Sequence, residues 1–377
     1  MNLGIVCYPT YGGSGVLATE LGMALAHKGH NVHFITSHQP VRLNFLNPNL
    51  HFHEVFLEDY PLFHYQPYVL ALSSKLAEVA EKYDLDIVHV HYAIPHAYAA
   101  YMAKQMLKER GINLPIVTTL HGTDITLVGS HPVYKMAVEF SINNSDVVTS
   151  VSDSLKKDTM RLFNINREID VIHNFVDFSK QKDVNDEDCK RGSLANSEEK
   201  IITHVSNFRP VKRILDVIST FYEIQKSIPS KLLMVGDGPD REKAEILAKE
   251  MGIKQKILFM GKSDEIREIL CFSDLFLLPS ETESFGLAAL EAMAARTPVI
   301  SSNTGGIPEV NVQGETGFLS DVGDVIGMAK NAVYILSDEE LLNRFKDNAC
   351  DHAHKFSMEN ILPRYEEMYR RVKENCC

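Results

Sequence analysis

Short apolar runs alternate with amphipathic stretches along most of the chain. In the first half, runs of strand length occur at 3–8, 32–36, 53–57, 87–91, 116–120 and 147–151. Stretches with the three-to-four-residue apolar period of a helix lie at 16–28, 70–83 and 97–110. Because strands that alternate with helices form parallel sheets covered by helices, we predict an α/β domain here.

The pattern breaks once and then resumes. A strand-like run ends near Phe175, and the segment 177–200 is polar, rich in charge and without an apolar period. Further strand-like runs follow at 201–205, 232–235, 257–260, 275–278 and 299–301, and the chain is helical from Asp338 onward. The break predicts a domain junction between two similar doubly wound halves.

Composition narrows the class of protein. The 377 residues are 45% hydrophobic and 23% charged, with a formal net charge of −12. This predicts a soluble globular protein and argues against nucleic acid as the main partner. No run of about 18 apolar residues and no basic leader occurs, so we expect neither a membrane partner nor a signal peptide. The six cysteines are scattered and lack a C-x-x-C motif, which favours a reduced, cytoplasmic protein. The role of the adjacent Cys376 and Cys377 stays open.

The turn after the first predicted strand is rich in glycine. Gly13, Gly15 and Ala18 match the G-x-G-x-x-A fingerprint of dinucleotide-binding turns. Those turns also need an acidic residue about 20 positions further on, and none lies between Glu20 and Glu54. The dinucleotide interpretation therefore fails. The turn can still offer helix N-terminal amides to an anion, with tight helix–sheet packing as the alternative for the glycines.

In the second half, four strand ends carry polar or glycine-rich sequences. "SETESFGLAALEAMA" contains Glu283 and Glu291 with seven residues between them, and "HVSNFRPVKR" contains Arg209 and Lys212. "MVGDGP" and "GGIPEV" end two further strands. Taken alone, such a pair is more often a helix N-terminal charge, here Glu283, and part of a solvated helix face, here Glu291. Because parallel strands end at one edge of a sheet, the four together predict a site for an anionic ligand with hydroxyl groups.

Two patterns resemble metal sites. Residues 84–86 read D-x-D, but they precede a strand, whereas ligands bind at the carboxyl ends of strands, so we expect a helix-to-strand turn. His89, His91 and His96 lie close in sequence without an acidic residue or cysteine to complete a zinc site. We expect His89 in the core, His91 and Tyr92 at the rim of a cleft, and no metal or other cofactor.

These motifs resemble those of retaining glycosyltransferases of family four, which have the GT-B fold. The resemblance covers essentially the whole chain and rests on the Glu-x7-Glu spacing of Glu283 and Glu291, the loop of Lys212 and "GGIPE". It implies two Rossmann-like doubly wound parallel-sheet domains that face each other across a cleft. The acceptor domain would comprise residues 1–178 and the nucleotide-sugar donor domain residues 200–362, with a helix at 363–377 packing back on the first domain.

A closer resemblance to one branch of this family, carried by "CYPTYGGSGVLATELG" and "TTLHGTDIT" among other segments, implies substrates and chemistry. The donor would be UDP-N-acetylglucosamine and the acceptor the hydroxyl of L-malate, a metal-independent reaction that begins bacillithiol biosynthesis. Two alternatives stay open. One is the same donor with another acceptor, such as an inositol phosphate or a glycan. The other is a non-catalytic nucleotide-sugar-binding protein, against which the presence of Lys212, Glu283 and Glu291 argues. The oligomeric state, a homo-oligomer included, is not predicted.

By the same resemblance, Lys212 and Arg209 would neutralise the diphosphate, and Glu283 and His121 would lie beside the donor hexose. The residues that would bind the donor are Gly13, Ser14, Gly15, Asn207, Gly236, Asp237, Phe285, Gly286, Leu287 and Glu291, the last at the ribose. Many relatives have an arginine where this chain has Asn207, so whether Arg209 supplies that charge stays open.

For the acceptor, the first half offers polar side chains on loops or at strand ends. They are Tyr11, Arg42, Tyr92, Thr119 and Asn174. Arg42 is the natural bidentate partner of a malate carboxylate. A surface ion pair of this arginine with Glu54 or Glu58 is an equally good interpretation.

Overall fold

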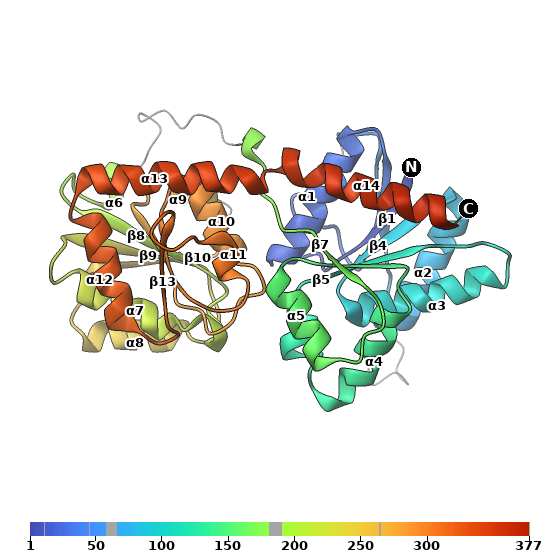
Figure 1. Ribbon diagram of the computed structural model, residues 1–377, viewed down its shortest axis with the longest axis horizontal. Helices are drawn as coiled ribbons and strands as arrows, with labels where there is room; N and C mark the ends of the chain where they lie inside the picture. Colours follow the sequence, from blue (N-terminus) through green and yellow to red (C-terminus); the bar gives the residue numbers. More distant parts are fainter. Residues whose placement is uncertain (11, 45, 58–65, 181–190, 264, 377) are drawn as a thin grey trace. The chain divides into compact units, whose positions relative to one another are not determined.

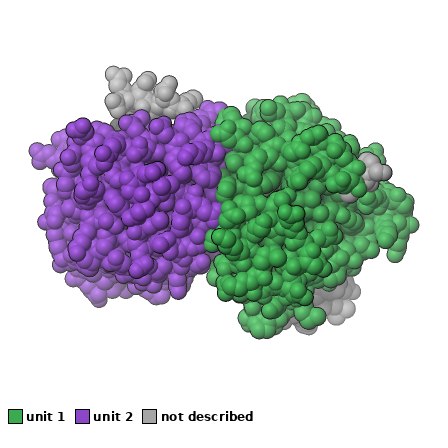
Figure 2. Space-filling view, in the orientation of Figure 1, with its two compact units in different colours: residues 1–174, 359–377 green, residues 175–358 purple. Residues whose placement is uncertain are grey.

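The computed structural model describes residues 1–376 except 11, 45, 58–65, 181–190 and 264. The chain forms two compact units (Figure 2). Unit 1 comprises residues 1–174 and 359–377, and unit 2 comprises residues 175–358. Tyr11, one of the residues considered for the acceptor, lies outside the described residues.

Unit 1 is built on a parallel sheet of seven strands in the order β3-β2-β1-β4-β5-β6-β7 (Figure 1). The strands are β1 (Asn2–Val6), β2 (Asn31–Thr36), β3 (Leu50–Glu54), β4 (Ile87–His91), β5 (Ile116–Leu120), β6 (Val147–Ser150) and β7 (Ile169–Val171). The helices are α1 (Gly13–His27), α2 (Tyr68–Tyr83), α3 (Tyr98–Lys108), α4 (Pro132–Asn143), α5 (Asp153–Leu162) and α14 (Met358–Cys376), with short helical turns η1 (Ala93–Ala97) and η2 (Thr123–Leu127). Every residue of β4 and β5 is buried, as expected for central parallel strands covered on both faces.

Unit 2 has a second parallel sheet, with six strands in the order β10-β9-β8-β11-β12-β13. The strands are β8 (Lys200–Val205), β9 (Ser230–Val235), β10 (Ile257–Gly261), β11 (Leu275–Leu278), β12 (Val299–Ser302) and β13 (Gly317–Ser320). The helices are α6 (Arg191–Leu194), α7 (Ile214–Ile224), α8 (Arg241–Glu250), α9 (Ile266–Cys271), α10 (Leu287–Ala294), α11 (Ile307–Val310), α12 (Val325–Leu336) and α13 (Glu339–Ala353), with short turns η3 (Phe178–Lys180), η4 (Pro210–Lys212), η5 (Lys254–Lys256) and η6 (His354–Phe356). The predicted fold class, two Rossmann-like doubly wound parallel-sheet domains, is confirmed.

Several helices begin where a side chain satisfies free backbone amides. Ser152 Oγ accepts a hydrogen bond from the Leu155 N–H at the start of α5, over 3.0 Å. At the start of α13, Asp338 accepts one from the Leu341 N–H, also over 3.0 Å. By contrast, the N-termini of α1 and α10 have no side-chain cap among the described residues. Their first amides are therefore available to a ligand.

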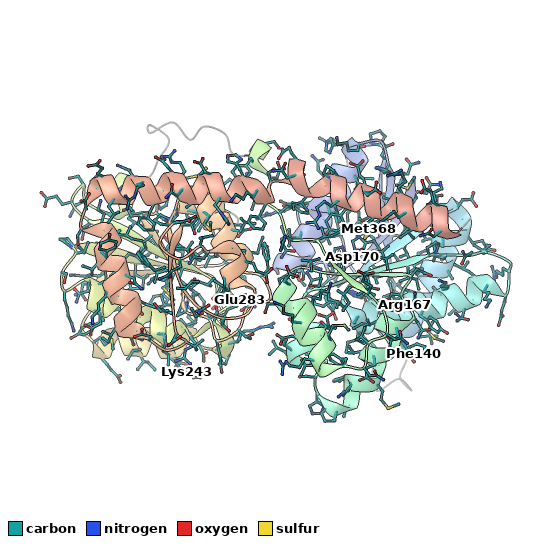
Figure 3. The ribbon with its side chains drawn as sticks, in the orientation of Figure 1. Phe140, Arg167, Asp170, Lys243, Glu283 and Met368 are labelled. Atoms are coloured by element: carbon teal, nitrogen blue, oxygen red, sulfur yellow. The ribbon has the colours of Figure 1, made fainter. Side chains whose placement is uncertain are left out.

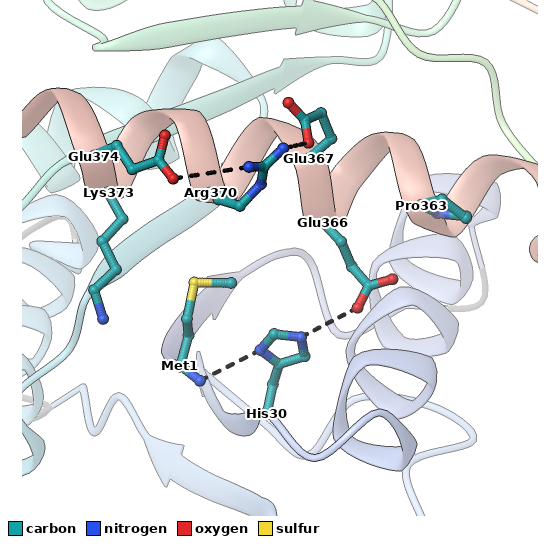
Figure 4. A pocket seen from close by; sticks show the side chains of 8 residues that line it. All are labelled: Met1, His30, Pro363, Glu366, Glu367, Arg370, Lys373 and Glu374. Atoms are coloured by element: carbon teal, nitrogen blue, oxygen red, sulfur yellow. Dashed lines mark hydrogen bonds and ion pairs between the residues drawn. The ribbon is translucent and has the colours of Figure 1, made fainter.

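The C-terminal helix α14 belongs to unit 1. Tyr369 and Met368 on this helix are buried, and Figure 3 labels Met368. A pocket between α14 and the start of the chain is lined by Met1, His30 and several α14 residues, with His30 Nε2 lying 3.4 Å from Glu366 Oε1 (Figure 4). The pocket lies at the amino end of β1, whereas open α/β sheets bind ligands at their carboxyl ends, so it is not the candidate site.

Each sheet reverses its strand order once, between β1 and β4 in unit 1 and between β8 and β11 in unit 2. At such a reversal the loops that follow the two strands diverge and leave a crevice at their carboxyl ends, where ligands bind in open α/β sheets. Most of the functional residues expected from the sequence follow these strands or their neighbours. No helix in the described part of the chain is long and apolar enough to cross a membrane.

Candidate functional site

An ion pair joins the two loops at the strand reversal of unit 2. Lys212, in the loop after β8, places its Nζ 2.5 Å from Oε1 of Glu283, in the loop after β11 (Figure 3 labels Glu283). Ser280 donates a hydrogen bond to the same carboxylate oxygen over 2.9 Å. The two charged side chains are 21% and 14% exposed. They are therefore largely shielded from water but still reachable by a ligand.

Backbone hydrogen bonds hold these loops against the "GGIPEV" segment. The Glu281 N–H donates to the Val211 carbonyl over 2.8 Å, and the Gly306 N–H donates to the Glu283 carbonyl over 2.9 Å. Gly305 has a φ of +55°, and a Cβ there would lie 2.0 Å from the Glu283 carbonyl oxygen. A side chain at Gly305 would therefore push the loop of Glu283 away.

Helix α10 begins at Leu287, four residues after Glu283, and carries Glu291 about one turn into the helix. Gly286 precedes its first residue with a φ of +97°, a conformation that glycine adopts without strain. Phe285 is buried and packs against Phe356 with ring centroids 5.7 Å apart. Its side chain therefore anchors the turn, while the backbone amides around Gly286 and Leu287 form the uncapped N-terminus, which suits an anion.

The Gly-Asp-Gly turn after β9 lies against the loop after β8. A Cβ on Gly236 would lie 1.8 Å from the Ser206 carbonyl oxygen, so the close approach requires glycine. Asn207, Arg209 and Asp237 are exposed around this contact. Asp237 lies 3.6 Å from Arg241. Arg209 forms no ion pair with any residue that the structure describes, so its charge is available to a ligand.

His204, on β8, was not singled out from the sequence. It is completely buried, with Nδ1 hydrogen-bonded to the Leu277 carbonyl on β11 and Nε2 to Ser206 Oγ, each over 2.8 Å. Burial lowers the pKa of His204 to about 4, so the ring is neutral near pH 7. A neutral histidine thus links the two strands beneath Lys212 without adding a positive charge.

In unit 1, a hydrogen bond spans the corresponding strand reversal. Ser14, in the first turn of α1, lies with its Oγ 2.6 Å from the hydroxyl of Tyr92, which follows β4. A Cβ on Gly15 would lie 2.4 Å from the Tyr8 carbonyl oxygen, so tight packing accounts for this glycine. Gly13 is exposed and its amide lies at the uncapped helix end. The first turn of α1 therefore combines a packing role with a free anion-binding terminus.

His121, which follows β5, is held by both its backbone and its ring. Its Nε2 lies 2.8 Å from Nδ1 of His91. The buried carboxylate of Asp124 accepts hydrogen bonds from the N–H groups of His121, Gly122 and Ala93, over 3.3, 3.0 and 2.8 Å. Burial raises the pKa of Asp124 to about 6 and lowers the pKa of His121 to about 3. Asp124 therefore fixes the turn that carries His121, and His121 is neutral.

Burial bears on four expectations for this region, and only that for His89 agrees with it. His91 is not at a rim, since it is only 2% exposed. Thr119 is completely buried, and its hydroxyl is hydrogen-bonded to His89 Nε2 and to Thr149, each over 2.7 Å, so it lies behind the site rather than at its surface. The interpretation of His89 as a core residue matches its complete burial. Asn174 is 8% exposed, with little side-chain surface for an acceptor.

Arg42 pairs with a residue that was not considered. Its Nη1 lies 3.4 Å from Oε1 of Glu20 on α1, and its side chain is 39% exposed. Glu54 instead faces His38 at 3.9 Å, and Glu58 lies outside the described residues. The arginine therefore lies beside the first helix, with its side chain partly exposed.

The protein engages several of the donor atoms in the two metal-like patterns. The Asp86 carboxylate accepts a hydrogen bond from the Asn2 N–H and pairs with Lys373, each over 2.8 Å. His89 uses Nδ1 for the Tyr369 hydroxyl and Nε2 for Thr119. A metal ion at either pattern would have to displace these contacts, and the absence of a metal stays a prediction.

Comparisons with known proteins agree across both units. Residues 11–180 match the family described as Glycosyltransferase Family 4, and residues 185–352 match Glycosyl transferases group 1. The chain is 49% identical to the N-acetyl-alpha-D-glucosaminyl L-malate synthase of Bacillus anthracis over 99% of this chain and 97% of that protein. It is 27% identical to a D-inositol 3-phosphate glycosyltransferase of Corynebacterium urealyticum over 76% and 72% of the two chains.

Solved structures show the same fold at low identity. A sucrose-phosphate synthase from Thermosynechococcus elongatus superposes with a TM-score of 0.82 at 21% identity, covering 99% of both chains. The Anabaena protein HepE in complex with UDP and glucose gives a TM-score of 0.84 at 16% identity, covering 98% of this chain and all of that one. At these identities the likeness extends to the fold alone.

Proposed function

The chain belongs to the family four glycosyltransferases, and from this premise we propose that it transfers N-acetylglucosamine from UDP-N-acetylglucosamine to the hydroxyl of L-malate. The proposal is supported by the 49% identity to the malate synthase of Bacillus anthracis, which extends over both units. In this role it would catalyse the first step of bacillithiol biosynthesis. The scattered cysteines support a location in the cytoplasm.

The observation that carries the proposal is the ion pair of Lys212 and Glu283 at the strand reversal of unit 2, beside the uncapped start of α10. A diphosphate would take the lysine charge, and the freed carboxylate would accept hydrogen bonds from hexose hydroxyls. Glu291 would bind the ribose, and Arg209 would add a second cation. We further propose that His121 binds the hexose and that the amides of Gly13 and Ser14 bind phosphate oxygens, since the Gly15 N–H already donates to the Gly12 carbonyl over 3.0 Å.

We propose a retaining reaction on one face of the sugar. The bond from the anomeric carbon to the UDP oxygen breaks, and the malate hydroxyl oxygen forms a new bond to the same carbon from the same side. A phosphate oxygen of the leaving group takes the hydroxyl proton, so no protein base is needed. The protein then has two tasks, which are to position the substrates and to stabilise the charge that grows on the phosphate.

For the acceptor, we propose Arg42 as the partner of one malate carboxylate. Its guanidinium group has five N–H donors, and the contact to Glu20 at 3.4 Å leaves most of them free. Tyr92 is placed by its hydrogen bond to Ser14 at the same edge of the sheet. Thr119 is withdrawn from this role because it is buried.

A UDP-release assay over several donors and acceptors tests the proposal. We expect release with UDP-N-acetylglucosamine and L-malate to exceed release with an inositol phosphate or simple glycans, and proton NMR to show an α-linked product. A preference for inositol phosphate would replace malate as the acceptor. UDP-sugar binding without release for any acceptor would show a binding protein instead.

A further inference from the structure

His91 combines full burial with an unsatisfied polar atom. Its Nε2 has no hydrogen-bond partner among the described residues, although the side chain lies at the end of β4 and is 2% exposed. A buried polar atom without a hydrogen bond lowers the stability of the folded state, and such atoms are few in native proteins, so this one needs a physical reason. The other ring nitrogen, Nδ1, is used, since it lies 2.8 Å from Nε2 of His121.

The surroundings prevent His91 from turning away from this contact. Its ring stacks on His89 with centroids 4.5 Å apart, and on the other side it lies 5.1 Å from the ring of His121. His89 is itself fixed at both nitrogens by Tyr369 and Thr119. The His91 carbonyl accepts a hydrogen bond from His96 over 2.5 Å, which holds the backbone. The pair with His121 is therefore a fixed feature of the sheet edge.

Both rings of the pair are neutral near pH 7. Burial lowers the pKa of His91 well below its usual value and lowers that of His121 to about 3. A neutral imidazole carries one N–H, so a single proton lies between the two rings and sets both tautomers. Either His91 Nδ1–H donates to His121, or His121 Nε2–H donates to His91.

The unsatisfied atom distinguishes these two arrangements. If His121 donated, the buried Nε2 of His91 would carry an unpaired N–H, and orphaned buried N–H groups are rare in proteins. If His91 donates from Nδ1, the orphaned Nε2 is a bare lone pair, the less costly case. His121 then accepts at Nε2 and carries its proton on Nδ1. This second nitrogen has no partner among the described residues, so it can donate to a ligand.

We propose that His91 is a positioning residue that fixes the tautomer and orientation of His121, so that His121 presents an Nδ1–H donor to the hexose of the bound donor. The inference rests on the proposed function, because it is the sugar donor that gives His121 its partner. His91 itself does not touch substrate. Its effect on the reaction passes through the ring of His121.

The first test measures the tautomer directly. In the substrate-free enzyme, ¹⁵N NMR of labelled histidine should show His121 with its proton on Nδ1 and a bare Nε2. In His91→Leu, which keeps an apolar side chain of similar size but has no donor, the ¹⁵N shifts of His121 should move toward a mixture of tautomers. A proton on Nε2 of His121 in the wild type, or unchanged shifts in the variant, would overturn the inference.

The second test separates positioning from a merely structural role. His91→Leu should lower kcat by about 10–100-fold, as loss of a partner that orients a functional histidine does elsewhere. The Kd for UDP, whose binding the proposed function assigns to unit 2, should not rise, and the melting temperature should not fall. His91→Asn places an amide N–H near the position of Nδ1 and should recover much of the loss. Wild-type kcat for His91→Leu would refute the proposal.

The sheet offers a matched control. His33 on β2 is 3% exposed and places its Nδ1 2.9 Å from Nε2 of His53, the same pair of atoms in a second histidine pair. His33→Leu should leave kcat unchanged. Because the ¹⁵N measurement needs no substrate, it stands even if the acceptor is not malate. Absence of UDP release by the wild type with every acceptor would overturn the proposed function alone.

Discussion

Replacing Lys212 with alanine should reduce turnover much more than UDP affinity. Lys212 Nζ lies 2.5 Å from Glu283, with both side chains largely shielded from water. In the proposed reaction this charge faces a phosphate whose negative charge grows as the sugar bond breaks. Removing one well-placed group of this kind costs about 10²–10³ in kcat, or about 3 kcal/mol of transition-state stabilisation.

The same substitution should also lower the stability of unit 2. A charge-assisted hydrogen bond contributes about 1.5–3 kcal/mol, and Glu283 keeps its hydrogen bond from Ser280, so we expect the lower end of that range. For a unit of this size, the melting temperature should fall by about 3–6 °C. The double variant Lys212→Ala/Glu283→Gln should lose less stability than the two single losses added together, because they remove the same contact.

Lys346 provides a matched control for these measurements. It is also 21% exposed, and its Nζ lies 3.1 Å from Asp274, in the same unit but at the amino ends of β8 and β11, opposite the loops of the candidate site. Lys346→Ala should lower the melting temperature and leave kcat unchanged. Steady-state kcat, the Kd for UDP and thermal unfolding of the three enzymes give the comparison. Near-wild-type kcat for Lys212→Ala would refute the assignment, and Arg209 would then become the candidate.

Four further predictions follow from the same contacts. Glu291→Gln should weaken UDP and UDP-sugar binding by similar factors in calorimetry, because the ribose is common to both ligands; an effect on the sugar nucleotide alone would contradict this role. Activity should survive excess EDTA, since lysine and helix N-termini take the diphosphate charge; loss that manganese restores would count against it. Tyr369→Phe removes the 2.7 Å hydrogen bond to His89 and should cost about 1–3 kcal/mol in denaturant unfolding; an unchanged midpoint would show that water replaces the hydroxyl. Finally, stability should fall as the pH drops from about 6.5 toward 4. The pKa values of His89 and His121 are about 3 in the folded state, below the ordinary value near 6.5. Between these pH values the unfolded chain therefore binds more protons than the folded protein. Each of the two histidines then lowers the free energy of unfolding by up to about 1.4 kcal/mol for each pH unit of acidification. Asp124, with its pKa raised to about 6, opposes this with one group; a stability that rises on acidification would contradict the prediction.

The strands that the sequence predicted best are those in the middle of each sheet. β4, β5 and β11 have the predicted bounds, because strands buried on both faces are continuous apolar runs. β3 was predicted three residues too late, since this edge strand reads "LHFHE" and is mostly half-buried. The strand β13 was missed because "GFLS" has a glycine and a serine at its ends and therefore lacks the continuous apolar run of β11.

The candidate site was predictable as a set of strand ends and not as a set of contacts. The order of strands and helices along the sequence predicts that the loops of Lys212 and Glu283 each follow a parallel strand. Because parallel strands end at a common edge of the sheet, it also predicts that the two loops lie at the same edge. The ion pair of Arg42 with Glu20 and the pairing of His91 with His121 depend on which strands are neighbours. The depth of Thr119 depends on two layers of packing around β5 that the local sequence does not encode.

The division of unit 1 into two pieces of sequence has a consequence for biosynthesis. Residues 359–377 complete a unit whose other residues end at 174, while unit 2 is continuous in sequence. As the chain leaves the ribosome, unit 2 has all of its residues before unit 1 does, although unit 1 begins first. Until α14 emerges, His89 lacks the Tyr369 hydroxyl, and the face of the sheet that Tyr369 covers stays open to water or to chaperones. Nascent chains arrested just before residue 359 should therefore hold a finished unit 2 and an unfinished unit 1.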